Sequence, residues 1–148
     1  MRVNEWVGCT GFPCKDVRHE CYIVPDVAPR PEDVQIVLVS EAAPPDLDDY
    51  YYAGGDPLFP QTTVQAFQDA GTDVTAIQDI LDLGVYLTTA VKCGKTGYGI
   101  KAATIRECSR LLEQEPPARV VRVAQAEEAQ RDLDHHRAGD AEGVAHED

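Results

Sequence analysis

The chain has 148 residues, with 26 Asp and Glu against 13 Lys and Arg, and its formal net charge is −13. This length suits one domain. No segment approaches the roughly 18 apolar residues of a membrane span, and residues 1–5 lack the basic start and apolar run of a signal peptide. We therefore expect a cytoplasmic protein without a membrane partner, and the acidic charge argues against extensive nucleic-acid contact, which needs Lys and Arg.

The first 31 residues contain three of the five cysteines, at Cys9, Cys14 and Cys21, and show little periodicity. This stretch reads as irregular structure that needs stabilisation from outside its own core. Without a secretory signal, disulfides are not expected. The thiols therefore belong either to a metal site or to scattered core positions, where cysteine acts as a small hydrophobe.

Four segments between residues 35 and 112 have the pattern of regular structure. Residues 35–40 form a continuous apolar run, typical of a strand buried on both faces of a parallel sheet. A helix begins near Thr62 or Thr63 and ends at Gly71, and a shorter helix capped by Thr75 ends at Gly84. Residues 85–91 predict the next strand. Residues 104–107 read as a capping box that begins a last helix, with Ile105, Cys108, Leu111 and Leu112 on one face. The order predicts an α/β fold with parallel strands.

After residue 115 the composition changes. Residues 114–148 carry nine acids against four bases, and residues 118–148 contain no Lys, Ile, Phe, Tyr, Trp, Ser, Thr or Cys. Residues 118–123 predict a short third strand. Two explanations for the region 116–148 stay open: a disordered acidic extension, or a non-native end encoded by an altered reading frame.

Four motifs in chain order carry a resemblance to a known family. They are Val37-Leu38-Val39-Ser40-Glu41-Ala42-Ala43-Pro44, Asp56-Pro57-Leu58-Phe59, Thr88-Thr89-Ala90-Val91-Lys92-Cys93 and Glu107-Cys108-Ser109-Arg110-Leu111-Leu112. Together they resemble the front half of the iron–sulfur uracil-DNA glycosylases. The resemblance implies a three-layer glycosylase-like parallel sheet, truncated after its second or third strand. Residues 1–115 would form the N-terminal part of that domain.

The resemblance also implies an activity, a DNA partner and a site. These enzymes hydrolyse the N-glycosidic bond of uracil or a related damaged base in DNA. By that likeness, Glu41 would be the catalytic carboxylate that stabilises the sugar cation or orients a water. Phe59 would stack on the flipped base, and Thr89 and Ala42 would contact it. An exposed loop carboxylate at Glu41 and a core contact at Phe59 are the plainer alternatives.

The family holds a [4Fe–4S] cluster on four thiolates. Cys93 and Cys108 match its last two ligands, and Cys9 and Cys14 would supply the others, with Cys21 as a possible substitute. Four thiolates also suit zinc, and the plain alternative is that Cys108 is a core residue. A cluster here would be structural and would hold the irregular N-terminal stretch against the sheet.

Two departures from the family argue against turnover. The family commonly has Asn where this chain has Thr89, and a hydroxyl cannot reproduce the paired donor and acceptor of an amide. No His-Pro-Ser type loop follows, and His135, His136 and His146 read as solvated residues. We therefore expect an incomplete and inactive glycosylase homologue, and the alternative is a non-catalytic metal-binding or interaction module.

Two further groups were open to a nucleic-acid role. Lys92, Lys95 and Lys101 fall close together and fit either a DNA phosphate patch or a solvated turn. The three residues Tyr50 to Tyr52 fit either stacking on nucleic acid or a half-buried flap. The sequence does not predict the oligomeric state.

Overall fold

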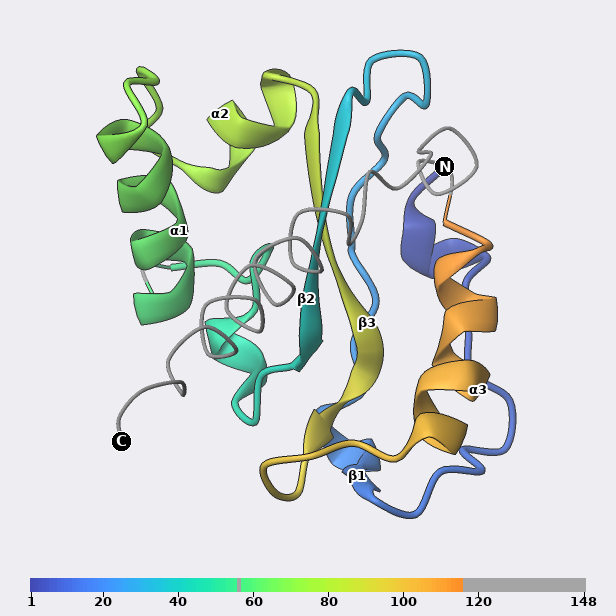
Figure 1. Ribbon diagram of the computed structural model, residues 1–148. Helices are drawn as coiled ribbons and strands as arrows, with labels where there is room; N and C mark the ends of the chain where they lie inside the picture. Colours follow the sequence, from blue (N-terminus) through green and yellow to red (C-terminus); the bar gives the residue numbers. More distant parts are fainter. Residues whose placement is uncertain (56, 116–148) are drawn as a thin grey trace, which may run out of the picture.

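The structure is a computed structural model that describes residues 1–55 and 57–115, and in this part of the chain it is a mixed α/β fold. Figure 1 shows helices on both sides of a small sheet. The strands are β1 (Val17–Arg18), β2 (Ile36–Ala43) and β3 (Val85–Lys95), and the helices are α1 (Leu58–Asp69), α2 (Ile77–Asp82) and α3 (Ala102–Leu112). None of the helices in these residues has the length and apolar character needed to cross a bilayer.

The sheet has the strand order β1-β3-β2. β2 and β3 run parallel, with Ile36 opposite Val85 and Ser40 opposite Thr89, which confirms the predicted parallel pair. The expectation of a wholly parallel sheet is wrong, because β1 pairs antiparallel with the end of β3. This two-residue strand comes from the irregular N-terminal stretch, where no hydrophobic alternation announces it.

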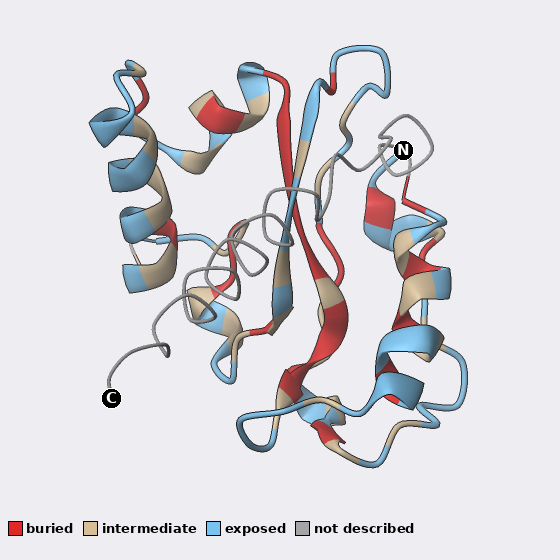
Figure 2. Ribbon diagram, viewed as in Figure 1, coloured by how far each residue is buried: buried red, intermediate tan, exposed pale blue. Residues whose placement is uncertain are grey.

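Among the described residues β2 lies at the edge of the sheet, and the prediction that it is buried on both faces is wrong. Ile36, Leu38 and Val39 are 51%, 41% and 46% exposed. Figure 2 shows the contrast with its neighbour, since β3 is buried along almost its whole length. The apolar run correctly indicated a strand, but in the described residues it is β3 that occupies the centre of the sheet.

The core is divided by the sheet. On one side, Val85 and Leu87 of β3 pack with Ile80 of α2 and with the residues Tyr50 and Tyr51. On the other side, Tyr86 packs with Leu111 of α3 and with N-terminal valines, while Cys93 packs with Cys108. The two adjacent β3 residues Tyr86 and Leu87 thus face opposite sides, as the two-residue period of a strand requires.

Helix α1 begins at Leu58, four residues before the predicted cap at Thr62. The Asp49 carboxylate accepts a hydrogen bond from the Phe59 backbone N–H (2.8 Å) and so satisfies a donor of the first turn. The hydroxyls of Thr62 and Thr63 instead donate to the Phe59 carbonyl (2.9 Å each). The predicted end is confirmed, because Gly71 follows the helix with a left-handed φ of +90°.

In the turn before α2, Thr75 does not cap the helix as predicted, and the capping carboxylate is that of Asp79. The Asp79 carboxylate accepts from the Thr75 backbone N–H, the Thr75 hydroxyl and the Ala76 backbone N–H, and these bonds lower the pKa of Asp79. After the helix, Gly84 has a φ of +84°, and a Cβ there would stand 2.6 Å from the Asp33 carbonyl oxygen. Gly84 therefore permits both the turn and the close approach that starts β2 beside β3.

Helix α3 is capped from a distant part of the chain, so the predicted capping box at residues 104–107 is wrong. The Asp16 carboxylate accepts from the Lys101 backbone N–H (2.7 Å) and from the Thr104 hydroxyl. The Thr104 hydrogen bond is the largest cause that lowers the pKa of Asp16. Thr104 is consequently buried, while Glu107 faces outward and pairs with Arg110. Ile105, predicted on the buried face, is 46% exposed.

Candidate functional site

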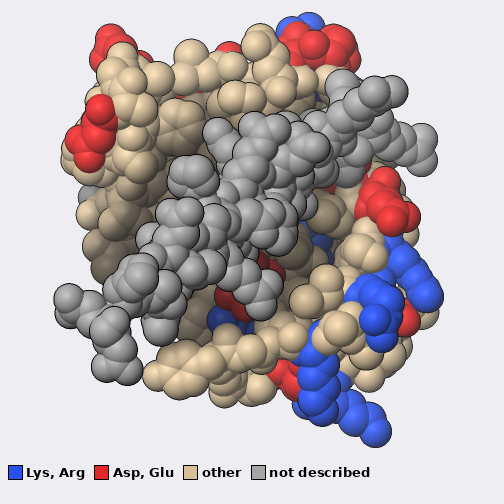
Figure 3. Space-filling model, in the orientation of Figure 1, with Lys and Arg blue, Asp and Glu red and all other residues tan. Residues whose placement is uncertain are grey.

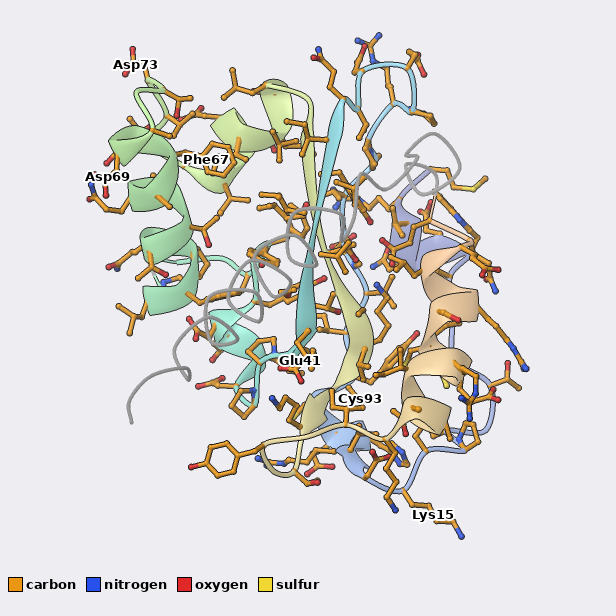
Figure 4. The ribbon with its side chains drawn as sticks, viewed as in Figure 1. Lys15, Glu41, Phe67, Asp69, Asp73 and Cys93 are labelled. Atoms are coloured by element: carbon orange, nitrogen blue, oxygen red, sulfur yellow. The ribbon has the colours of Figure 1, made fainter. Side chains whose placement is uncertain are left out.

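The carboxyl ends of the two parallel strands bring the candidate catalytic residue to one edge of the sheet. Glu41 lies near the end of β2, as Figure 4 shows, and its carboxylate accepts a hydrogen bond from Lys95 Nζ at the end of β3 (2.7 Å). The Glu41 side chain is 61% exposed and that of Lys95 is 29% exposed. In this arrangement the carboxylate is paired with a cation and faces solvent.

Thr89 occupies a different environment from Glu41. It is 1% exposed, and its hydroxyl has no hydrogen-bond partner in the part of the chain described. An unpaired buried hydroxyl is costly, by roughly 1–3 kcal/mol. Thr89 could contact a base only if the residues that cover it moved away.

Phe59 and Ala42 also contact the protein itself. The Phe59 ring packs on Tyr51 with 4.8 Å between centroids and 37° between planes. Ala42 packs against the group formed by Cys93, Cys108, Val17 and Val91. Glu41, Ala42, Phe59 and Thr89 therefore do not line one cavity in the described residues. Their proposed roles at a base stay predictions.

One surface cavity, with a volume of about 740 Å³, lies between α1, α2 and the tyrosine segment. Its lining includes Tyr51, Tyr52 and several glutamine side chains, and none of the four residues assigned to a base site. The second, of about 610 Å³, lies at the opposite end of β2 from Glu41. Neither cavity joins the carboxyl ends of the strands to a candidate catalytic group.

The cysteines come together around the end of β3. Cys93 and Cys108 are buried in one apolar group, and Cys14 packs against it. The backbone N–H of Cys9 donates to the Tyr22 hydroxyl (3.0 Å), and Tyr22 packs on the same group. Three separate segments, the N-terminal loop, β3 and α3, thus contribute thiols to one region, whose β3 end is marked by Cys93 in Figure 4.

Burial is the largest cause that raises the pKa of Cys93, and together with the neighbouring thiols Cys108, Cys9, Cys14 and Cys21 it brings that pKa to about 12. Burial also raises the pKa of Cys108, to which Cys14 and Cys9 add, while a hydrogen bond with the Lys92 backbone opposes the rise. Thiolates at these positions would repel one another without a cation between them. A bound metal group would reverse this balance, and because the thiols must lose protons to ligate it, binding would strengthen as the pH rises.

Cys21 has other partners. Its thiol donates to the Pro45 carbonyl (3.2 Å), and its Cβ lies so close to Gly94 that a Cβ on Gly94 would stand 2.9 Å away. It contributes least to the pKa of Cys93 and is not among the groups that shift Cys108. These contacts favour Cys9 and Cys14 over Cys21 as the N-terminal pair.

Four cysteines are the right kind of ligand for a group that binds four thiolates. Their side chains are not arranged here as a metal site. Among residues 1–55 and 57–115, no three His, Cys, Asp or Glu side chains are placed so that they could hold a metal ion. Ligation would therefore require the four thiols to lie closer together than they do here. The free thiols are consistent with that requirement.

Sequence reasoning missed a buried charged network beside this region. Lys92 and Glu115 are both fully buried and form an ion pair. Lys92 Nζ also donates to Thr88 Oγ1 (2.8 Å) and to the Thr89 carbonyl (2.6 Å), and the Tyr86 hydroxyl donates to Glu115 Oε2 (2.6 Å). Lys92 is therefore neither a phosphate contact nor part of a solvated turn. Its place inside the strand, between Val91 and Cys93, was the available signal.

The tyrosine segment is part of the core. Tyr50 and Tyr51 are 1% and 7% exposed, and the Tyr52 hydroxyl donates to the Leu87 carbonyl (2.9 Å) and accepts from the Leu87 N–H (3.0 Å). Tyr50 is enclosed, whereas Tyr51 and Tyr52 also line the cavity of about 740 Å³. The Tyr52 hydroxyl thus satisfies the backbone of Leu87 on the edge of β3 that faces away from β2.

Several expectations fall on residues that the structure does not describe. They concern the strand at residues 118–123, the nature of residues 116–148, and the solvated side chains of His135, His136 and His146. In comparisons with known proteins, no family model, curated protein or solved structure matches the chain.

Proposed function

We propose that this chain is a domain related to the base-excision DNA glycosylases, and that its cysteines hold a structural [4Fe–4S] cluster. The observation that carries the proposal is the gathering of thiols from three segments around the end of β3. Cys9, Cys14, Cys93 and Cys108 would be the ligands. The cluster would join the N-terminal segment to β3 and α3, a role that four-cysteine sites commonly have in small domains.

The parallel pair of strands supports the glycosylase part of the proposal. In open α/β sheets, ligands bind at the carboxyl ends of strands, and Glu41 lies at such an end. A carboxylate there can stabilise the positive charge that develops on a sugar as its glycosidic bond breaks. Uracil or a related damaged base in DNA would be the substrate of the active relatives.

A second candidate is a non-catalytic metal-binding or interaction module. The enclosure of Thr89, the packing of Phe59 on Tyr51 and the pairing of Glu41 with Lys95 favour it. Neither of the two cavities described above has Glu41 in its lining. We propose that the chain, with its base-site residues in this arrangement, binds metal and does not excise uracil.

Iron content tests the cluster. Anaerobically purified chain is expected to contain about four irons per molecule and to absorb broadly in the visible range. Cys14→Ser, in the half-buried N-terminal loop, is expected to lose most of this iron. Cys21→Ser keeps a donor for the Pro45 carbonyl and is the matched control, expected to retain it. Zinc in place of iron, or full iron in Cys14→Ser, would contradict the proposed cluster and its ligands.

Base excision is tested separately. With a single-stranded oligonucleotide containing uracil, the chain is expected to release no more uracil than Glu41→Gln does, because the base-site residues do not share a cavity. The measurement is strand cleavage after alkaline treatment. Uracil release by the wild type that Glu41→Gln abolishes would instead establish turnover and the catalytic role of Glu41, and would remove the second candidate.

A further inference from the structure

The loop between β3 and α3 carries an aromatic side chain that stands fully exposed from the described part of the chain. Tyr98 is 102% exposed. A Cβ on either neighbouring residue, Gly97 or Gly99, would meet no atom within 4 Å, so the backbone on both sides of Tyr98 is also free. Figure 1 shows this loop projecting beyond the end of the sheet. One exposed aromatic ring is unremarkable by itself, and the charge around it is the second observation.

The loop lies in the one long acid-free stretch of a very acidic chain. The net charge is −13, yet no Asp or Glu occurs between Asp82 and Glu107. Of the four bases in that stretch, Lys92 is buried, and Lys95, Lys101 and Arg106 reach the surface. Two acids from other segments do contact the region, since Asp16 bonds to the start of α3 and Glu41 pairs with Lys95. Because the stretch itself carries only positive charges, we expect it to repel a polyanion less than the acidic remainder of the chain does.

The N-terminal segment adds another cation to the same region. Thr96 Oγ1 donates to the Asp16 carbonyl (3.0 Å), and the Asp16 carboxylate holds the start of α3, so Lys15 is fixed beside the loop. Figure 3 shows Lys and Arg gathering over this side of the molecule, where Figure 4 labels Lys15. Lys15 and Arg106 form no ion pair within residues 1–55 and 57–115. We call Lys15, Tyr98, Lys101 and Arg106 the basic loop surface.

We propose that the basic loop surface binds single-stranded nucleic acid, with a base stacked on Tyr98 and phosphates held by Lys15, Lys101 and Arg106. An aromatic ring beside cations that follow a backbone is the usual combination in proteins that bind single strands. The proposal rests on the proposed function only because the two sites are neighbours. The loop follows Lys95, which pairs with the candidate catalytic residue Glu41. Binding of an undamaged strand requires no excision.

The composition of the loop favours nucleic acid over a lipid bilayer. A loop that inserts into a bilayer buries several apolar side chains. Here Tyr98 is the one exposed apolar side chain of residues 96–101, because Ile100 packs against the buried group of Cys93 and Cys108. The start of α3 is not an anion site either, since Asp16 already accepts from the Lys101 N–H.

Binding is expected to be modest and sensitive to salt. Three phosphate contacts on a single strand give a slope of about −2 when the logarithm of the association constant is plotted against that of the salt concentration. The acidic remainder of the chain limits the contact to a few nucleotides. Sequence preference is expected to be weak, because stacking on one ring accepts any base.

Fluorescence anisotropy of the full chain with a fluorescein-labelled oligothymidine that contains no uracil tests the proposal. Tyr98→Ala is expected to weaken binding by about five- to 150-fold, since one stacked base contributes about 1–3 kcal/mol. Tyr98→Phe keeps the ring and should bind like the wild type. Lys101→Gln should lower the salt slope by about 0.7. Arg30→Gln removes an exposed cation before β2, at the far end of the sheet, and should change nothing.

Three results would overturn the proposal: no binding at low salt, equal binding by Tyr98→Ala, or an equal effect of Arg30→Gln. Vesicles of phosphatidylcholine with phosphatidylserine serve as a second probe, and a Tyr98-dependent affinity for them that exceeds that for the oligonucleotide would also overturn it. Iron is measured in the same preparations. Iron-free chain that binds the oligonucleotide would refute the cluster and support nucleic-acid binding by the basic loop surface. Iron-loaded chain that does not bind the oligonucleotide would support the cluster and refute nucleic-acid binding by this surface.

Discussion

Replacing Lys92 with Met is expected to reduce the free energy of unfolding by about 3–5 kcal/mol, because the substitution leaves a buried carboxylate without its cation. Lys92 and Glu115 are both fully buried. The pKa of Lys92 is lowered, chiefly by burial, and the Glu115 charge opposes that lowering. Since small domains have total stabilities of about 5–15 kcal/mol, this variant should be close to unfolded. Urea denaturation followed by circular dichroism measures the loss.

The matched control for Lys92→Met is Lys95→Met, three residues further along the same strand. Lys95 pairs with the exposed Glu41, and such surface pairs contribute about 0–1 kcal/mol. A double variant, Lys92→Met with Glu115→Leu, removes both charges and should recover much of the lost stability. If Lys92→Met and Lys95→Met cost the same, Lys92 and Glu115 do not form a buried pair in solution.

Two neighbouring tyrosines are expected to respond in opposite directions to loss of the hydroxyl. Tyr52→Phe should destabilise the fold by about 2–4 kcal/mol, because the Leu87 N–H and carbonyl both lose their partner in a fully buried strand. Tyr50→Phe should be neutral or stabilising, because the buried Tyr50 hydroxyl has no partner among the described residues. Burial raises the pKa of both phenols, so both are neutral near pH 7.

Thermal unfolding of the two variants under the same conditions provides the measurement. Each substitution removes one oxygen atom from a side chain of the same size, so packing changes little between them. The difference between the two midpoints therefore reports the hydrogen bonds alone. Equal unfolding midpoints for the two variants would mean that the Tyr52 hydroxyl makes no hydrogen bond with the backbone of Leu87.

Local signals in the sequence predicted where helices and strands occur better than they predicted which residues pack around those elements. The apolar run at residues 85–91 and the glycines at 71 and 84 marked a strand and two helix ends, and the structure confirms them. The exposed position of β2 was not predictable, because an apolar run indicates a strand and not its place in the sheet. The cap of α3 was missed because Asp16 is separated from Thr104 by 88 residues.

The candidate site was predictable only in part, for a similar reason. The end of an apolar strand indicated where Glu41 would lie, but its pairing with Lys95 joins residues 54 apart. The sequence suggested a surface role for Lys92, because nothing near it announces the partner at Glu115. The cysteines could be grouped by resemblance, and the choice between Cys21 and the pair Cys9 and Cys14 needed the contacts of Cys21 with Pro45 and Gly94.

The long separation between contacting segments has a consequence for the order of folding. The N-terminal stretch bonds to residues made much later: Trp6 Nε1 donates to the Gln114 carbonyl (3.2 Å), and Asp16 holds the start of α3. Contacts of this kind form late, since a long loop must close first. During synthesis, Cys9 and Cys14 would therefore emerge from the ribosome well before Cys93 and Cys108. For the proposed cluster to form, the first two thiols would have to stay reduced and unoccupied until the rest of the chain arrives.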